Sequence, residues 1–196
     1  MLFRSLDYVY EKESTRADRV YLTQPVGGGR TIDYTWRQVV DEARRMAAHL
    51  RSLGLQPGDR VAMLSKNCAH FFMAELAIWM GGYTTVAIFP TEKADTIAYI
   101  LEHSEAKAIF IGKLDAGWEA QLQGIPDRLH RLSFPLAPQT IGSAWDTVIA
   151  TVAPLGADRV SVRVSLLSTA VSPDTWTRMV LDVSPGLKVS VPLVDE

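Results

Sequence analysis

The fold of this chain is decided by residues 60–89, which open with the run RVAML at residues 60–64. A short apolar run between polar residues is typical of a buried strand. Residues 68–80, CAHFFMAELAIWM, have the length of a helix and little polar surface, and two glycines follow them. A second strand-like run, TTVAIF at residues 84–89, then stops at a proline. The stretch therefore predicts a strand, a buried helix and a second strand in succession.

The same alternation continues on the C-terminal side of this stretch. A helix expected over residues 91–105 places Ile97, Ile100 and Leu101 on one face, and residues 106–111 form a further strand-like run. Strands that alternate with helices of ten or more residues imply right-handed crossovers and parallel pairing. We therefore predict an α/β fold with a doubly wound, mainly parallel sheet flanked by helices.

On the N-terminal side, Thr35 lies three residues before Gln38, which is the pattern of a capping box at the start of an amphipathic helix. Before it, residues 20–22 and 31–34 are typical of two strands, and they flank the three glycines 27–29. A glycine-rich loop can also hold phosphate, but such a loop needs a helix directly after the glycines to supply N–H donors. A strand follows here, so we favour a hairpin turn.

Residues 113–138 show a weaker pattern, and we interpret the apolar run near residues 132–134 as a strand in peripheral structure. Further along, residues 160–165 alternate like a half-exposed strand, and helix signals are few. We therefore divide the chain into an N-terminal α/β part, residues 1–155, and an irregular or β-prone tail, residues 156–196.

Composition excludes several classes of function. The 196 residues carry 20 lysines and arginines and 22 aspartates and glutamates, a net charge of −2, so the basic surface that nucleic acid requires is absent. The most apolar stretch, residues 68–80, is shorter than the roughly 20 apolar residues needed to span a bilayer. Cys68 is the only cysteine, so no intrachain disulfide can form, and we predict a cytoplasmic location.

Ligands of doubly wound folds bind at the carboxyl ends of the strands. In this sequence the predicted strands are followed there by residues 65–67 (SKN), 90–91 (PT) and 112–113 (GK). Asn67 is also in position to cap the helix that comes next. A flavodoxin-like nucleotide binder would need a phosphate turn after the first sheet strand, and residues 65–67 match such a turn only in part.

Other polar residues form no recognisable catalytic pattern. Four histidines lie on different predicted elements without partners at zinc-binding spacing: His49, His70, His103 and His130. Three aspartates are interpreted as turn or helix-start residues: Asp33, Asp59 and Asp95. Ser65 and Ser104 lack the pattern of a nucleophile elbow, which argues against a hydrolase.

Three motifs resemble the adenylate-forming superfamily, which includes acyl-CoA synthetases, luciferases and peptide-synthetase adenylation domains. The first is IDYTWRQV at residues 32–39 with the turn GLQPGDRVA at residues 54–62. The second is AIWMGGYTTV at residues 77–86, followed by FPT at residues 89–91. The third is IAYILEHSEAK at residues 97–107, and all three occur in the family's order and spacing. The same residues would also serve as the caps and buried strands of any α/β sheet.

The resemblance implies that the complete enzyme makes an acyl-adenylate from a carboxylic acid and ATP and then passes the acyl group to CoA, with Mg²⁺ neutralising phosphate charge. A fatty or other hydrophobic acid is the expected substrate class. The family holds the phosphates with a Ser/Thr/Gly-rich loop ending in Pro-Lys-Gly, which should fall near residues 160–185 and does not occur there. The nearest candidate, SLLSTA at residues 165–170, lacks glycine and a following lysine.

No position matches the family's later ATP-contacting glutamate, ribose-binding aspartate or C-terminal lysine, so no catalytic, cofactor-binding or metal-binding residue is assigned. We hypothesise that the residues from about 150 onward reflect truncation with or without a frame change, and that the chain alone is inactive. The alternatives are a non-catalytic binding module and one half of a split ligase, whose unfinished sheet edge accepts strands from a separately encoded remainder. An incomplete domain exposes core surface, so we also predict self-association or poor solubility.

Overall fold

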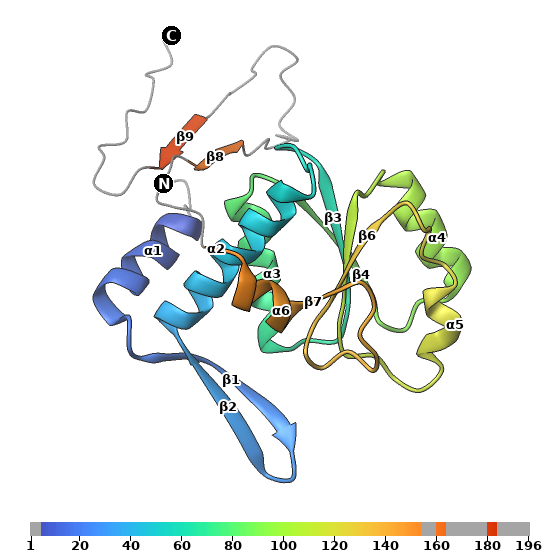
Figure 1. Cartoon of the computed structure of the whole chain (residues 1–196), viewed down its shortest axis with the longest axis horizontal. Coiled ribbons are helices and arrows are strands. Elements are labelled where there is room, and N and C mark those ends of the chain that lie inside the picture. The colour runs from blue at the N-terminus through green and yellow to red at the C-terminus, as the bar shows by residue number, and fades with distance from the viewer. Residues whose placement is uncertain (1–4, 154–159, 164–179, 184–196) are drawn as a thin grey trace, which may run out of the picture.

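A computed structural model describes residues 5–153, 160–163 and 180–183 of the chain. Its centre is a five-stranded sheet in which all neighbouring strands are parallel, in the order β4-β3-β5-β6-β7 (Figure 1). The strands are β3 (Arg60–Leu64), β4 (Thr84–Ile88), β5 (Ala108–Ile111), β6 (His130–Ser133) and β7 (Ser143–Ala144). This sheet confirms the predicted α/β fold.

Helices cover both faces of the sheet: α1 (Ser5–Arg16), α2 (Trp36–Ser52), α3 (Ala69–Met80), α4 (Ala94–His103), α5 (Trp118–Leu122) and α6 (Trp145–Thr151). The side chains of β3 show how two cores arise. Val61 and Met63 are buried in the core formed with α1, α2, α3 and α6, whereas Ala62 and Leu64 are buried beneath α4 (Figure 1). A parallel strand with helices on both sides has no solvated face, which is why this run has no polar residue after its first.

The capping box predicted for α2 is confirmed. The Thr35 Oγ1 accepts a hydrogen bond from the Gln38 N–H at 3.3 Å, and the Gln38 side chain accepts one from the Thr35 N–H at 2.8 Å. The helix ends before Gly54, whose φ of 89° is the left-handed conformation that favours glycine. These signals act over three or four residues, so the sequence alone could identify them.

The two predicted N-terminal strands form an antiparallel hairpin, β1 (Val20–Gly27) and β2 (Arg30–Thr35). Its turn has positive φ at Gly27, Gly28 and Gly29, the conformation that a tight glycine turn requires. Figure 1 shows the hairpin extending away from the helical layer. The three glycines therefore make a hairpin turn and do not precede a helix.

The strand predicted near residues 132–134 is confirmed as β6, but its interpretation as peripheral structure is wrong. β6 pairs with β5 inside the sheet, and its Leu132 is buried. Two elements were not predicted, β7 with two residues and α6 with seven, because both are too short for a periodic signal. Trp145 is 1% exposed, and its Nε1–H donates to the Glu42 Oε2 at 2.8 Å, which fastens α6 to α2.

Beyond α6 the structure describes two short strands, β8 (Val160–Arg163) and β9 (Val180–Val183), which pair antiparallel. They agree with the β-prone character predicted for this part of the chain. The division between residues 155 and 156 stays a prediction. Among the described residues, none of the helices combines the length and the hydrophobicity that a membrane crossing requires.

Candidate carboxyl-edge site

The candidate site lies where the winding of the sheet reverses. The chain places β4 on one side of β3 and then returns to place β5 on the other side. A doubly wound sheet opens a crevice at such a reversal, at the carboxyl ends of the two strands. Residues 65–67 follow β3 at this edge and residues 112–113 follow β5, so the site comprises two of the three predicted ligand-binding segments.

Ser65, which is 4% exposed, joins the two strand ends. Its Oγ accepts a hydrogen bond from the Lys113 N–H at 3.0 Å and donates one to the Lys66 carbonyl oxygen at 2.7 Å. Gly112 lies so close that a Cβ added to it would be 2.2 Å from the Ser65 Oγ and 2.5 Å from the Phe134 Cδ2. Protein atoms therefore fill the space between the two strand ends, and only glycine fits there.

Backbone groups at this edge also bond to each other. The Lys66 N–H donates to the Lys113 carbonyl oxygen at 2.8 Å, and the Gly112 N–H donates to the Leu64 carbonyl oxygen at 3.0 Å. The Lys66 ammonium forms an ion pair with Asp115. A phosphate-binding loop needs free N–H groups directed at the ligand, and these N–H groups are already used within the protein.

The third predicted segment, residues 90–91, borders a pocket of about 540 Å³. Asp115 and Gln121 also line this pocket, which lies between the start of α4 and α5. The Gln121 Nε2 donates to the carbonyl oxygens of Pro90 at 2.9 Å and Glu92 at 2.8 Å, which holds the loop after β4 against α5. Because Asp115 also pairs with the lysine of the first segment, all three predicted segments meet at one edge.

The start of α3 faces the same edge, but its first N–H group is capped. Gln24 in β1 is 6% exposed, and its Oε1 accepts a hydrogen bond from the Ala69 N–H at 2.8 Å. The prediction that Asn67 caps this helix is wrong: the N-cap residue is Cys68, and the capping side chain comes from 45 residues earlier in the chain. A flavodoxin-like phosphate site would need this N–H group, so the geometry does not support that alternative.

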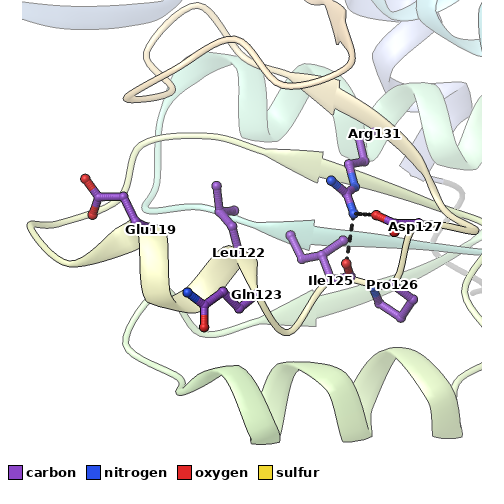
Figure 2. A pocket seen from close by; sticks show the side chains of 7 residues that line it. All are labelled: Glu119, Leu122, Gln123, Ile125, Pro126, Asp127 and Arg131. Carbon is purple, nitrogen blue, oxygen red and sulfur yellow. Dashed lines mark hydrogen bonds and ion pairs between the residues drawn. The ribbon is translucent and has the colours of Figure 1, made fainter.

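A second pocket, of about 480 Å³, lies beside α5 and the start of β6 (Figure 2). Arg131 contributes its only cation, and the Arg131 Nη2 donates to the Ile125 carbonyl oxygen at 2.9 Å and to the Asp127 Oδ1 at 2.8 Å. Asp127 and Glu119 in the lining more than balance the arginine charge, so the pocket offers no excess positive charge to an anion. No residue predicted as a site residue lines it.

His70 is the one fully buried histidine among the described residues, at 3% exposed. Its ring packs edge-on against Tyr34, with centroids 5.6 Å apart, and against Trp145, at 5.4 Å. Burial lowers the pKa of His70 from 6.5 to about 4, and the nearby Asp146 carboxylate opposes this shift. The His70 Nδ1 has no hydrogen-bond partner in the described structure. A neutral imidazole enclosed by aromatic rings is a core residue.

The other histidines have local contacts. His103 stacks on Tyr99 with ring centroids 5.6 Å apart. Burial, with a smaller contribution from the charge of His130, lowers the pKa of His49. Within residues 5–153, 160–163 and 180–183, no three histidine, cysteine, aspartate or glutamate side chains are grouped to hold a metal ion.

Two of the three aspartates have the predicted local roles. The Asp59 Oδ2 accepts a backbone N–H bond at 2.7 Å in the turn before β3, and Asp95 lies in the first turn of α4. Asp33 lies within β2 instead, where its Oδ1 accepts a bond from the Thr23 Oγ1 at 2.6 Å, so its interpretation as a turn residue is wrong. Ser104 is the C-cap residue of α4.

The described part of this edge does not fit ATP by itself. Its strand ends are closed by Ser65, the start of α3 is capped by Gln24, and residues 165–170, the nearest candidate for a phosphate loop, lie outside the described residues. The pocket beside residues 90–91 is a hollow of about 540 Å³ at this edge.

Residues 10–143 match the family model "AMP-binding enzyme". The match covers more than half of the chain and includes all three motifs quoted from the sequence. The chain therefore belongs to the AMP-binding enzyme family, and the resemblance inferred from the sequence is confirmed.

Within this family the chain is similar to CoA ligases. It is 33% identical to the long-chain-fatty-acid–CoA ligase FadD15 of Mycobacterium bovis over 52% of this chain and 17% of that protein. It is 30% identical to the uncharacterized protein Rv1549 of Mycobacterium tuberculosis over 47% of this chain and 51% of that protein. A benzoate CoA ligase from Burkholderia xenovorans shares the fold, with a TM-score of 0.65 and 22% identity over 81% of this chain and 32% of that one. The chain thus spans a third or less of the length of each of these two ligases.

Proposed function

We propose that this chain is the N-terminal part of an ATP-dependent carboxylate–CoA ligase. The complete enzyme would form an acyl-adenylate and pyrophosphate from a carboxylic acid and ATP, and would then transfer the acyl group to the CoA thiol with release of AMP. The observation that carries the proposal is the match of residues 10–143 to the AMP-binding enzyme model. The five-stranded parallel sheet, whose winding reverses at β3, agrees with it, because the chain shares its fold with a benzoate CoA ligase.

The same geometry supports the further proposal that the chain is inactive by itself. Charge on a transferring phosphoryl group must be neutralised by oriented N–H donors, lysine and Mg²⁺. At the carboxyl edge the Lys66, Gly112 and Lys113 N–H groups are all bonded to protein oxygens. ATP, Mg²⁺ and CoA are therefore proposed for the complete enzyme, and none of them is assigned to residues of this chain.

We further propose a hydrophobic carboxylic acid as the substrate and the cytoplasm as the location. The names of two similar proteins include a long-chain fatty acid and benzoate, which share an apolar body and one carboxylate. The cytoplasmic proposal rests on Cys68, a buried free thiol that has no disulfide partner in the sequence.

Two assays on the purified chain test this proposal. Titration calorimetry with ATP and Mg²⁺ is expected to show no saturable heat, and pyrophosphate release with decanoate or benzoate is expected to stay at the level without enzyme. Acid-dependent pyrophosphate release from the chain alone would contradict the proposed inactivity and would mean that residues 165–170 or another segment hold the phosphates.

A second candidate function is one half of a split ligase, and the comparison with Rv1549 favours it. The 92 residues matched in that protein are 51% of its length, so chains of similar size carry this region outside a full-length ligase. Co-expression with a neighbouring reading frame that encodes a Ser/Thr/Gly-rich Pro-Lys-Gly loop is expected to give acyl-CoA only when both chains are present. Acyl-CoA formation by the neighbour alone would show that this chain is not its catalytic half.

A further inference from the structure

The two edge strands of the five-stranded sheet differ in the amount of unpaired backbone that they expose. β7 has two residues, so it leaves very little free backbone. β4 has five residues and, among the residues that the structure describes, pairs only with β3. Natural proteins usually blunt a free edge with lysine, proline or a bulge. The run TTVAIF at residues 84–89 contains no charge and no proline, so nothing in it prevents another strand from pairing.

The exposed hairpin shows the protection that β4 lacks. β1 contains Pro25, and the pairing of β1 with β2 shifts register at two places. β2 carries the charged residues Arg30 and Asp33. The unprotected edge is therefore a particular property of β4 and not a general feature of this chain.

One contact shows which backbone groups of β4 are free. The Thr84 N–H donates to the Asp59 carbonyl oxygen at 2.9 Å, so the backbone groups of Thr84 face β3. Backbone groups alternate in direction along a strand, so those of Thr85, Ala87 and Phe89 face away from the sheet. Thr85 and Ala87 each offer a donor and an acceptor to a further strand, whereas Phe89, just beyond β4, offers only its N–H, because its carbonyl oxygen already accepts a hydrogen bond from the Glu92 N–H at 3.1 Å.

The side chains of the same residues lie on the α3 side of the sheet, because Ala87 is in register with Met63, which is buried in the core on that side. Ala87 is exposed, and Phe89 is 74% exposed. Phe72, in the first turns of α3, is 44% exposed. Thr85 on the same side is half-buried. Strands of a parallel sheet are normally covered on both faces, so the part left uncovered at Ala87 and Phe89 is where a neighbour would bury apolar surface.

We propose that this edge pairs antiparallel with β4 of a second copy of the chain, about a twofold axis at Ala87. In this register Thr85 lies opposite Phe89 of the other copy, and Ala87 lies opposite its own counterpart. The two Ala87 residues exchange two backbone hydrogen bonds, and each Phe89 N–H donates to the Thr85 carbonyl oxygen of the other copy, so the interface has about four.

The side chains suit a second copy better than an unrelated strand. The large Phe89 ring of one copy covers the small Thr85 of the other, and the two alanines leave room for both rings. Since residues 84–89 carry no charge, the twofold axis brings no like charges together. This pairing uses the edge of β4 and does not depend on the proposed ligase function.

The expected dimer is weak, because the edge of one five-residue strand buries much less than the roughly 1,600 Å² of a standard protein interface. We expect a dissociation constant of about 10–100 μM. Sedimentation velocity from about 1 μM to 1 mM should show the weight-average mass rising from one chain toward two. Ala87→Lys places two ammonium groups at the axis and should weaken the dimer by at least about tenfold.

Tyr99→Lys is the matched control, since Tyr99 is also an exposed apolar residue, at 64%, but lies on α4. It should dimerise like the unaltered chain, and circular dichroism should show that both lysine variants fold. A chain that stays monomeric to 1 mM, as it would if the edge served only the remainder of a ligase, would overturn the proposal. So would equal dissociation constants for the two lysine variants.

Cysteine crosslinking tests the register. Opposed residues of a hydrogen-bonded antiparallel pair have Cα atoms about 5.5 Å apart, within the range of a disulfide, so Ala87→Cys should crosslink on mild oxidation. Thr85→Cys should not, because its counterpart lies four residues along the strands, about 13 Å away. Cys68 is 6% exposed and should not compete. Crosslinking of Thr85→Cys as fast as Ala87→Cys would refute the register.

Discussion

Replacement of Gly112 by alanine should destabilise the chain through a defined collision. The new Cβ would lie 2.2 Å from the Ser65 Oγ and 2.5 Å from the Phe134 Cδ2, which is 2% exposed. Overpacking of this kind costs roughly 1–3 kcal/mol. Displacing the Ser65 hydroxyl also breaks its two hydrogen bonds, at about 1 kcal/mol each, while loss of glycine flexibility in the unfolded chain returns roughly 0.4–1 kcal/mol. The expected net loss is therefore about 2–4 kcal/mol.

Urea denaturation followed by tryptophan fluorescence measures this loss, and a double-mutant cycle tests its cause. Ser65→Gly removes the atom that collides first, so Gly112→Ala should cost about 1–2 kcal/mol less in the Ser65→Gly background than in the natural chain. Gly28→Ala is the control, because nothing lies within 4 Å of its Cβ and its φ of 60° predicts only backbone strain of about 1 kcal/mol. A cycle with no coupling would refute the conclusion that protein atoms fill the space between the ends of β3 and β5. So would a loss of unfolding free energy in Gly112→Ala that is no larger than the loss in Gly28→Ala.

Two further predictions concern buried polar groups. Gln24→Ala removes the acceptor of the Ala69 N–H and should lower the free energy of unfolding by about 1–3 kcal/mol, whereas the exposed Thr23→Ala should cost under about 0.5 kcal/mol; equal urea midpoints would contradict the capping role. For His70 the folded pKa of about 4 lies below the unfolded 6.5, so the unfolded chain binds the extra proton. Stability should therefore fall as the pH drops from 6.5 to 4, by up to about 3 kcal/mol, and His70→Phe should remove that part of the slope; an unchanged slope in the variant would show that other groups cause it.

The sequence predicted the elements whose signals are local. The capping box at Thr35, the glycine turn of the hairpin and the apolar run of β3 each depend on a few neighbouring residues, and each formed as expected. Short elements gave no such signal, so α6 was missed although its Trp145 is among the largest fully buried side chains. The carboxyl-edge segments were also predicted, because the strand–helix alternation alone places them at one edge.

Local residue patterns were therefore enough to predict the α/β alternation, the family motifs and the segments that meet at the carboxyl edge. How those segments meet is visible only in the folded chain, because contacts between distant residues leave no local pattern. Gln24 caps α3 from 45 residues away, and Ser65 closes on Lys113 from 48 residues away. The runs of β3 and β4 are both apolar, yet only the order of the sheet makes the first an interior strand and the second an edge strand among the described residues. An apolar run indicates burial, but the neighbour that buries it is set by the packing of the whole chain.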